Sequence, residues 1–180
     1  HGWRSFTDPQ RLARELSEYF SELGGEIINA DVKRIEMGSA KAKCLHLLDG
    51  SQLDVDKLVV AAGCWANTLL SDLGIRIPLA PLHGYHTDIA DSGVSLSRPV
   101  VYASGGFVNT PVESGLRIAG TVEIAPLNAL PNYRRAEVLV EKAQRHLFPG
   151  LTHTHGSQWM GARPFMPDTL PVIGPAPGLA

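Results

Sequence analysis

One segment of the sequence combines a cation, a carboxylate and a stiff backbone. Residues 161–174 read Gly-Ala-Arg-Pro-Phe-Met-Pro-Asp-Thr-Leu-Pro-Val-Ile-Gly, so Arg163 and Asp168 share the segment with three prolines. An arginine held in a cleft binds a carboxylate through two parallel hydrogen bonds of fixed geometry. The alternative is a structural ion pair between Arg163 and Asp168. The segment therefore predicts either a carboxylate-binding arginine or a charged turn.

A second segment has the pattern of a chain that passes close to a bound dinucleotide. Residues 58–62 are the apolar run Leu-Val-Val-Ala-Ala, and Gly63 follows directly before a predicted helix. A buried strand that ends at a small residue and leads into a helix lets the backbone approach such a ligand. Many α/β crossovers share this pattern, so it carries weight only together with a second motif.

Searches for common catalytic motifs find none of them. The sequence contains no G-x-G-x-x-G, no G-x-x-x-x-G-K-[ST], no G-x-S-x-G and no H-E-x-x-H. The nearest glycine-rich stretch, residues 104–106, precedes no helix, and we expect a loop there rather than a phosphate cradle.

Histidines and cysteines offer only weak metal or redox signals. His153 and His155 alternate along the chain, and His83 and His86 flank a Gly-Tyr pair, but neither pair has a third ligand nearby. We therefore predict no metal site. Cys44 and Cys64 lack C-x-x-C spacing, and we expect two buried thiols in a reducing compartment, with a disulfide or a catalytic thiol as the alternative.

Composition bounds the class of protein. The 180 residues are 44% hydrophobic and 19% charged, with a formal net charge of -2, which is typical of a globular protein. Basic residues are scattered, so we expect no nucleic-acid partner. No apolar run has the length of a membrane helix, and the first residues lack the apolar core of a signal peptide. The absence of an initiator Met and the loop-like last residues suggest a chain cut at both ends.

Local signals predict mixed helix and strand. Asp8 can cap a helix that begins at Pro9, apolar residues then recur at helical spacing, and Gly24 ends the helix. Alternation and turn residues predict a small meander closed by an Asp-Gly hairpin turn at 49–50, and then, from about residue 85, a run of antiparallel strands. Strands are expected at residues 26–35, 43–48, 58–62, 85–89, 99–103, 107–112, 116–123, 156–165 and 170–173, and further helices at 65–73 and 131–147.

Together these segments resemble the family of FAD-dependent D-amino-acid oxidases and dehydrogenases, which includes glycine and sarcosine oxidases. The family patterns V-V-A-A-G-x-W, I-P-L-x-P-x-x-G-Y-H and G-x-R-P-x-x-P-D-x-L-P-V-I-G match residues 59–65, 77–86 and 161–174. Within the family, the chain is most similar to the small subunit of bacterial D-amino-acid dehydrogenases. The N-terminal G-x-G-x-x-G, its ribose-binding acidic residue and a C-terminal G-H-G segment are absent.

The resemblance implies an α+β fold: an antiparallel substrate-binding sheet with flanking helices, plus part of an α/β FAD-binding domain. Residues 1–80 and 156–180 would belong to the FAD-binding side and residues 81–155 to the substrate sheet. Because the family's phosphate-binding motif is missing, we expect this chain alone to be inactive and not to retain FAD. Sheet edges left open in this way favour a homodimer.

The resemblance also implies a reaction and a set of site residues. In such enzymes a hydride passes from the substrate α-carbon to flavin N5, and the resulting imino acid is hydrolysed to a keto acid, so no catalytic side-chain base is required. Arg163 would bind the substrate carboxylate, helped by Tyr102 or, as second choice, Tyr85, although each tyrosine is equally well explained by packing. The residues expected near FAD are Val32, Ala62, Gly63, Cys64, Ile173 and Gly174.

The sequence is also compatible with other functions. A 2-hydroxy-acid dehydrogenase on the same scaffold would also need Arg163, and a non-catalytic module or subunit that binds a small carboxylate is a second class. The electron acceptor is oxygen or a quinone. We expect a cytoplasmic location, with peripheral association with the inner membrane as a variant.

Overall fold

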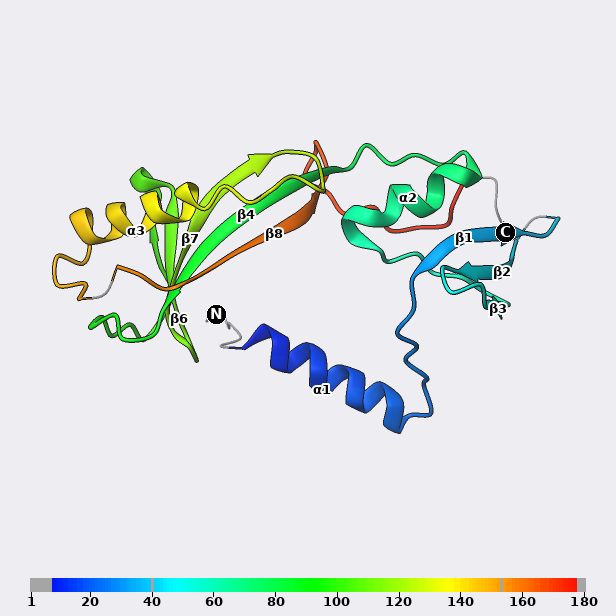
Figure 1. Cartoon of the computed structure of the whole chain (residues 1–180), viewed down its shortest axis with the longest axis horizontal. Coiled ribbons are helices and arrows are strands. Elements are labelled where there is room, and N and C mark those ends of the chain that lie inside the picture. The colour runs from blue at the N-terminus through cyan, green and yellow to red at the C-terminus, as the bar shows by residue number, and fades with distance from the viewer. Residues whose placement is uncertain (1–7, 40, 153, 178–180) are drawn as a thin grey trace. The chain divides into compact units, whose positions relative to one another are not determined.

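The computed structural model describes residues 8–39, 41–152 and 154–177. Its contacts divide the chain into two compact units (Figure 1). The first unit comprises His1–Ile27 and His83–Ala162, and the second comprises Ile28–Leu82 and Arg163–Ala180. The predicted boundaries, at residues 80/81 and 155/156, set apart a similar middle stretch but assign the first helix and the start of the last strand differently.

Helix α1, Pro9–Glu22, begins and ends where the sequence predicts. The Asp8 carboxylate accepts a hydrogen bond from the Arg11 backbone N–H at 2.9 Å, and Pro9 occupies the first turn. Gly24 follows the helix with a φ of 89°, a left-handed conformation that glycine adopts without a steric penalty. No residue of α1 is buried. Its apolar stripe of Leu16, Phe20 and Leu23 is therefore exposed.

A five-stranded sheet has the order β5-β6-β7-β4-β8. The β5–β6 and β6–β7 pairs are antiparallel, as the alternation predicts. Gly115, at the tight β6–β7 turn, has a φ of 123°, and a side chain there would collide with the backbone of residues 89–90. The strands are β4 Ala80–Ile89, β5 Val100–Tyr102, β6 Phe107–Val112, β7 Gly115–Ile124 and β8 Ser157–Phe165.

Helix α3, Arg134–His146, covers this sheet and completes the core of the first unit. Its buried residues follow helical spacing: Ala136, Leu139, Val140 and Ala143. They meet apolar side chains of β4, β6 and β7, with Ile118 fully buried at the centre. Glu137 in the first turn and Arg145 in the last turn complement the helix dipole. The prediction of an amphipathic helix here is confirmed.

The second unit contains a three-stranded antiparallel meander in the order β1-β2-β3. Its strands are β1 Val32–Met37, β2 Ala42–Leu47 and β3 Gln52–Asp54. The predicted hairpin turn is present: Gly50 has a φ of 89°, and the Asp49 carboxylate accepts hydrogen bonds from the backbone N–H and the hydroxyl of Ser51.

A short helical segment completes the second unit, near the position that the sequence predicts. It consists of the 3-10 turn η1 Gly63–Trp65, the α-helix α2 Ala66–Leu70 and the 3-10 turn η2 Ser71–Leu73. Asn67 ties it to the following chain through two hydrogen bonds to the backbone of Ile77. Another 3-10 turn, η3 Ala103–Gly105, lies in the first unit and confirms that the glycine-rich stretch there is a loop.

Three strand predictions are wrong. Residues 58–62 and 170–173 form no strand, and residues 26–31 are irregular before β1 begins at Val32. A buried parallel strand needs neighbours on both sides for its hydrogen bonds. Neither of the two sheets among the described residues includes 58–62, and Val59 is 86% exposed. The apolar run therefore stays extended without pairing.

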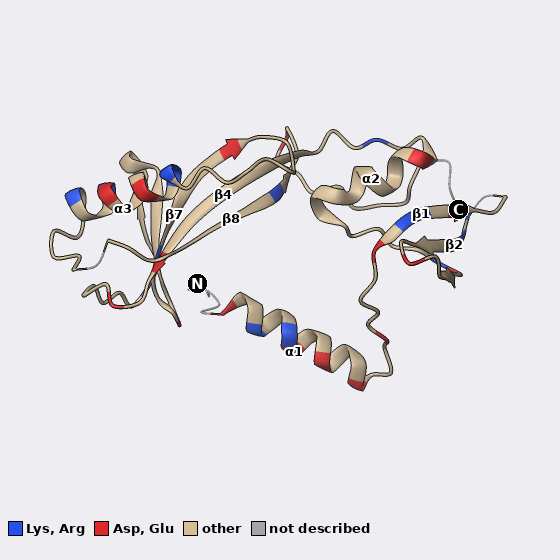
Figure 2. Ribbon diagram, in the orientation of Figure 1, with Lys and Arg blue, Asp and Glu red and all other residues tan. Residues whose placement is uncertain are grey.

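Both α1 and α3 carry charged side chains of both signs (Figure 2). Within the part of the chain that the structure describes, no helix combines the length and apolarity needed to cross a membrane.

Candidate functional site

A hollow in the second unit brings the two sequence motifs together. Its volume is about 440 Å³, within the range of small-molecule sites. The segment after residue 59 forms one wall and the proline-rich segment after Arg163 forms another. The hollow is lined by residues 60–63, Ala66, Ile77, Leu79, 164–166 and 169–172.

The walls of the hollow suit a flat apolar ring. No lining residue carries a charge, and Thr169 provides the one polar side chain among them. Residues 58–62 belong to no strand, so their backbone groups are not taken up by a sheet ladder. The lining therefore fits the ring system of a flavin, which needs apolar contact and backbone hydrogen bonds. It lacks the glycine-rich turn before a helix and the cations that would hold a diphosphate.

Gly63 sets the path of the chain at one wall. Its φ of 52° lies in the left-handed region, which a residue with a Cβ adopts only with strain. The Trp65 N–H then donates to the Ala62 carbonyl at 2.9 Å and starts η1. The glycine thus turns an extended wall into a helical segment within one residue.

A tight turn forms the opposite wall. The Thr169 N–H donates to the Met166 carbonyl at 2.9 Å, and the Leu170 N–H donates to the Asp168 carboxylate at 3.1 Å. Among the described residues, Thr169 is the one non-glycine residue with a positive φ, at 63°. A β-branched residue in this conformation costs about 1–2 kcal/mol, and such strain gathers at ligand-binding positions.

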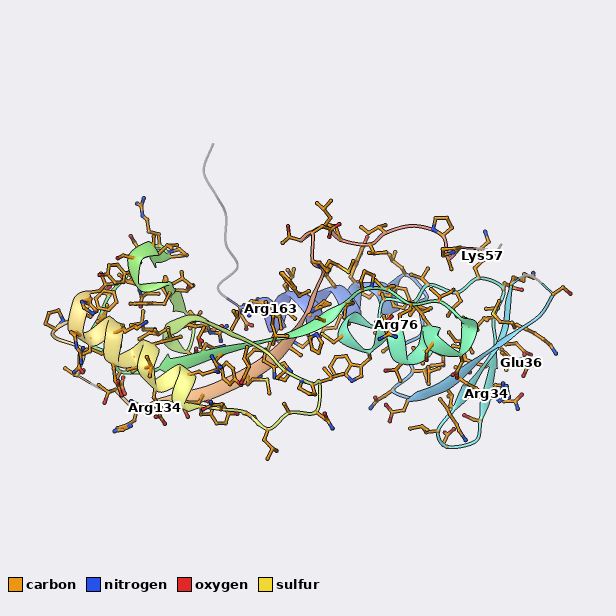
Figure 3. The ribbon with its side chains drawn as sticks, turned by 90° about the horizontal axis from the view of Figure 1, so that it is seen from above. Arg34, Glu36, Lys57, Arg76, Arg134 and Arg163 are labelled. Carbon is orange, nitrogen blue, oxygen red and sulfur yellow. The ribbon has the colours of Figure 1, made fainter. Side chains whose placement is uncertain are left out.

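Arg163 stands beside this hollow. It is exposed and directly precedes Pro164, the first residue of the second wall (Figure 3). In the described ranges, no hydrogen bond or ion pair engages its guanidinium. Asp168, the alternative partner, instead caps the turn through Leu170. Among the described residues Asp168 forms no ion pair with Arg163, and the role of Arg163 toward a carboxylate stays a prediction.

The structure places some of the residues predicted near the cofactor in the lining of the hollow and others outside it. Ala62 and Gly63 line the hollow. Cys64 is buried just behind them, where burial raises the pKa of its thiol. Ile173 and Gly174 are exposed and follow the last lining residue. Val32, a distant position in sequence, opens strand β1. Their roles toward FAD stay predictions.

Sequence reasoning missed part of the lining. Ile77, Leu79 and the run 170–172 face the hollow, although none was singled out as a site residue. Two sequence features could have indicated these lining residues: the apolar alternation around Pro78 and the apolar run after Asp168. Both were interpreted as extended chain or strand.

Tyr85 is held by the protein itself. The side chain is fully buried, its hydroxyl donates to the Glu123 carboxylate at 2.6 Å, and it accepts a hydrogen bond from the Asn132 N–H. Burial, followed by the hydrogen bond to Glu123, raises the pKa of Tyr85. The same hydrogen bond, aided by Arg135, lowers the pKa of Glu123. The hydroxyl thus has a donor and an acceptor partner, which favours the packing role.

Tyr102 also packs within the first unit. Its half-buried ring contacts the Phe107 ring edge-on, with centroids 5.3 Å apart, and stacks on His146 at 5.9 Å. Its part in carboxylate binding stays a prediction.

The histidines are spread over separate environments. His83 is fully buried and finds no hydrogen-bond partner for either ring nitrogen among the described residues, whereas His86 stacks on Trp159. His155 is exposed, and His153 lies outside the described residues. Among the described residues, no three His, Cys, Asp or Glu side chains are grouped as a metal site would require.

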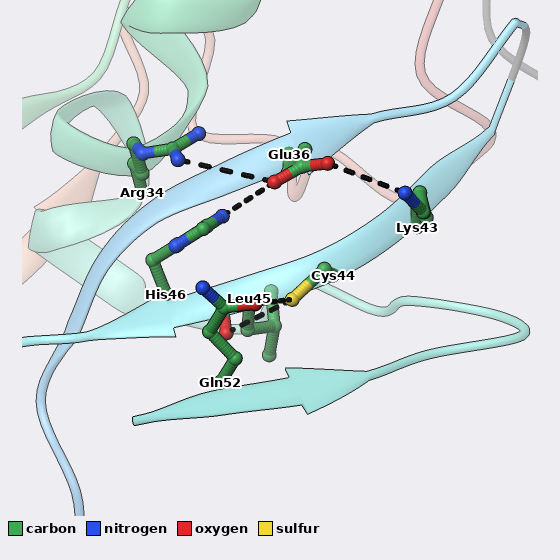
Figure 4. A network of polar contacts seen from close by, with 7 residues as sticks. All are labelled: Arg34, Glu36, Lys43, Cys44, Leu45, His46 and Gln52. Atoms are coloured by element: carbon green, nitrogen blue, oxygen red, sulfur yellow. Dashed lines mark hydrogen bonds and ion pairs between the residues drawn. The ribbon is translucent and has the colours of Figure 1, made fainter. Parts of the chain in front are cut away.

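A polar network braces the meander (Figure 4). Glu36 on β1 contacts His46 on β2 at 2.6 Å and Lys43 at 3.6 Å, and the hydrogen bond from His46 lowers the pKa of Glu36. The buried Cys44 thiol donates to Gln52 on β3. Both cysteines are free and buried, as predicted for structural thiols.

Comparison with known proteins identifies the family. The family model for FAD dependent oxidoreductases, abbreviated DAO, matches residues 2–180. A D-amino-acid oxidase from Bradyrhizobium diazoefficiens is 31% identical over 94% of this chain and 41% of its own length. A D-amino acid dehydrogenase from Paramagnetospirillum magneticum is 29% identical over 94% of this chain and 41% of its own length.

A solved structure supports the fold. The L-proline dehydrogenase from P. horikoshii superposes with a TM-score of 0.76 at 22% identity, covering 96% of this chain and 48% of that protein. The chain thus spans about two fifths of the curated relatives that it matches. Its sequence match along residues 2–180 places it in the DAO family of FAD-dependent oxidoreductases.

Proposed function

We propose that this chain is the substrate-side portion of an FAD-dependent enzyme that oxidises the Cα–N bond of an amino acid, with a D-amino acid as substrate. The observation that carries the proposal is the exposed Arg163, which no described residue pairs, next to an apolar hollow built from the two family motifs. A guanidinium beside such a hollow suits a substrate that has a carboxylate at one end and must react next to a cofactor ring.

Each part of the site has a separate task in this proposal. FAD, when bound, accepts the two electrons and the hydrogen lost from the substrate α-carbon. Arg163 holds the substrate carboxylate and thereby fixes the orientation of the α-carbon. The apolar lining, with Ala62 and Gly63 on one wall and the 169–172 run on the other, receives the ring and excludes water. A neutral substrate amine needs no protein base, which agrees with the lack of a charged side chain in the lining.

The choice of a D-amino acid rests on the relatives. The similar proteins from Bradyrhizobium and Paramagnetospirillum carry D-amino acids in their names, whereas the structure from P. horikoshii is an L-proline dehydrogenase. The higher sequence identity of the first two favours the D-configuration. Their names, an oxidase and a dehydrogenase, leave oxygen or a quinone as the acceptor.

The test uses the complete protein that contains this chain, loaded with FAD. Without oxygen, a panel of D-amino acids should bleach the flavin absorption band, while their L-enantiomers should not. Bleaching by 2-hydroxy acids but not by amino acids would replace the proposal with a hydroxy-acid dehydrogenase. A protein that takes up no flavin would support the carboxylate-binding module.

Arg163 has a matched control in the same unit. Arg163→Ala should raise the KM for the amino acid by about a hundredfold, because a bidentate charged hydrogen bond is lost. Arg76→Ala removes an equally exposed guanidinium from outside the hollow lining and should leave the KM unchanged. Equal effects of the two variants would rule out a specific carboxylate site at Arg163.

A further inference from the structure

Thr169 occupies a backbone position that glycine would occupy without strain. It is the last residue of a turn that the Thr169 N–H closes by donating to the Met166 carbonyl at 2.9 Å, with Pro167 as the second residue. Its φ of 63° lies in the left-handed region, which β-branched residues rarely adopt. The commonest turns favour glycine at their last position. The local structure therefore gives no reason for a threonine here.

The side chain of Thr169 does not support the turn in which the residue is strained. The turn is held by the backbone hydrogen bond to Met166 and by the Asp168 carboxylate, which accepts from the Leu170 N–H. Among the residues that the structure describes, no hydrogen bond engages the Thr169 hydroxyl, and the residue is exposed. Strain that brings no gain to the fold is typical of a ligand-binding position.

The hydroxyl lies in a wall of the hollow that offers few other hydrogen-bond donors. Thr169 is the one residue of the lining with a polar side chain. In the same wall, Pro164 and Pro171 have no N–H, and the N–H groups of Thr169 and Leu170 are used within the turn. A ligand in the hollow that needs a polar contact on this side therefore meets the Thr169 hydroxyl.

We propose that the Thr169 hydroxyl forms a hydrogen bond with a polar atom of the flavin ring and thereby fixes the ring in the hollow. This inference rests on the proposed function, because it takes the hollow to be the site of the ring. A flavin ring is flat and largely apolar, but one end carries carbonyl oxygens and an N–H. A hydroxyl can donate to the former or accept from the latter. Thr169 is thus a cofactor-binding residue.

The main experiment measures FAD binding to the complete protein, prepared without flavin, by the quenching of flavin fluorescence. Thr169→Val keeps the branched shape and the backbone strain but removes the hydroxyl. It should raise the Kd of FAD about tenfold, because a ring atom loses its partner. Thr169→Ser keeps the hydroxyl and should stay within about twofold of the wild type. Thr68→Val removes an exposed hydroxyl of α2 outside the lining and should leave the Kd unchanged.

ADP separates the ring from the rest of the cofactor. FAD and ADP share the adenosine diphosphate portion, but ADP has no ring. Thr169→Val should therefore leave the Kd of ADP unchanged. An equal weakening of FAD and ADP would show that Thr169 acts on the fold, and it would overturn the inference. An unchanged Kd of FAD in Thr169→Val would overturn it as well.

Thr169→Gly removes the strain and the hydroxyl together, so it should change stability and affinity differently. The flavin-free variant should unfold at the same temperature as the wild type or higher, because the relief of strain offsets the backbone entropy that glycine adds. The same variant should bind FAD about tenfold more weakly. A lower unfolding temperature would make the side chain a structural element, and an unchanged Kd would leave the strain without a ligand. Either result overturns the inference.

The proposed reaction and this inference fail in different ways. If the complete protein binds FAD but no amino acid reduces it, the proposed function fails, while the Kd of Thr169→Val still decides the role of Thr169. A wild-type protein that binds no flavin overturns both.

Discussion

The ion pair of Asp88 and Arg117 is a bidentate contact within the first unit. The guanidinium of Arg117 on β7 donates two hydrogen bonds of 2.8 Å to the carboxylate of Asp88 on β4. Burial alone would raise the pKa of Asp88, but the hydrogen bonds and charge of Arg117 outweigh burial and hold the pKa below its usual value. The hydroxyl of Ser114 and the ring of His86 also face this carboxylate.

Asp88→Asn should therefore destabilise the complete protein by roughly 2 kcal/mol at pH 7, because a charge-assisted pair that is largely shielded from water is lost. A carboxylate whose folded pKa is lowered stabilises the fold above its unfolded pKa, about 3.9, and loses this contribution as the pH falls through the lower folded value. The difference in unfolding temperature between wild type and variant should thus be full at pH 7 and shrink below about pH 4.

Asp91→Asn, at an exposed carboxylate two residues beyond β4, is the control and should change the unfolding temperature little at either pH. A destabilisation by Asp88→Asn that is equally large at pH 3 would mean that packing, and not the charge pair, is responsible.

At the residue scale the sequence singled out Arg163 but did not predict the partners of Tyr85 and Tyr102. Arg163 stood out because proline-rich flanks fix its backbone, and its local alternative, Asp168, lay only five residues away. The partner of Tyr85 is Glu123, 38 residues along the chain. Such a contact depends on strand register, which no local pattern specifies.

At the scale of the elements, the indole of Trp159 should couple the stability effects of substitutions at positions 159 and 161 of β8. Gly161→Ala places a methyl group where the Trp159 indole lies, and overpacking of this kind costs about 1–3 kcal/mol. In a Trp159→Ala background the space is vacant, so the same Gly161→Ala change should be nearly neutral. A double-mutant cycle on thermal stability of the complete protein should give a coupling energy above about 1 kcal/mol.

The control for this cycle is Gly150→Ala, since nothing lies within 4 Å of a Cβ at that position. Its effect should be the same with and without Trp159. Additive effects of Trp159→Ala and Gly161→Ala would contradict the contact between ring and strand.

Elements with their own start and stop signals were predictable from the sequence. The helix α1 is defined by Asp8 and Gly24, and the hairpin at 49–50 by its Asp-Gly pair. Residues 58–62 and 170–173 have the composition of strands, but neither run pairs with a strand of the two described sheets. Composition alone cannot supply hydrogen-bond partners. The sequence therefore could not predict the hollow that these two segments form, because the hollow depends on their positions in space.

At the scale of the whole molecule, apolar surface is exposed in both units. Leu16 and Phe20 of α1, Val59 and Ile173 are each at least half exposed. Exposed apolar side chains favour association when they gather into a patch, as they do along the stripe of α1. We therefore expect the 180-residue chain, produced by itself, to form dimers or larger species.

Light scattering after size-exclusion chromatography measures this association. Leu16→Glu puts a charge on the apolar stripe of α1 and should reduce the apparent mass. Ser21→Glu adds the same charge on another side of α1 and should not. A monomeric wild-type chain would exclude association through these faces.

The family was predictable from short motifs, whereas the fold was predictable only where an element has local start and stop signals. Three short motifs, at residues 59–65, 77–86 and 161–174, identified it because their order along the chain is specific, and the match over residues 2–180 confirms it. The division into units at residues 27/28, 82/83 and 162/163 depends on contacts between distant segments, which the motifs do not encode.

The seating of the Trp159 ring over Gly161 has an evolutionary consequence. Substitutions at the two positions are not independent, because a side chain at position 161 fits only when the indole at position 159 is absent. Among relatives, a bulky residue at the position of Trp159 should be accompanied by glycine two residues later. A lineage could fill the space over Gly161 only after it had lost the ring that occupied this space.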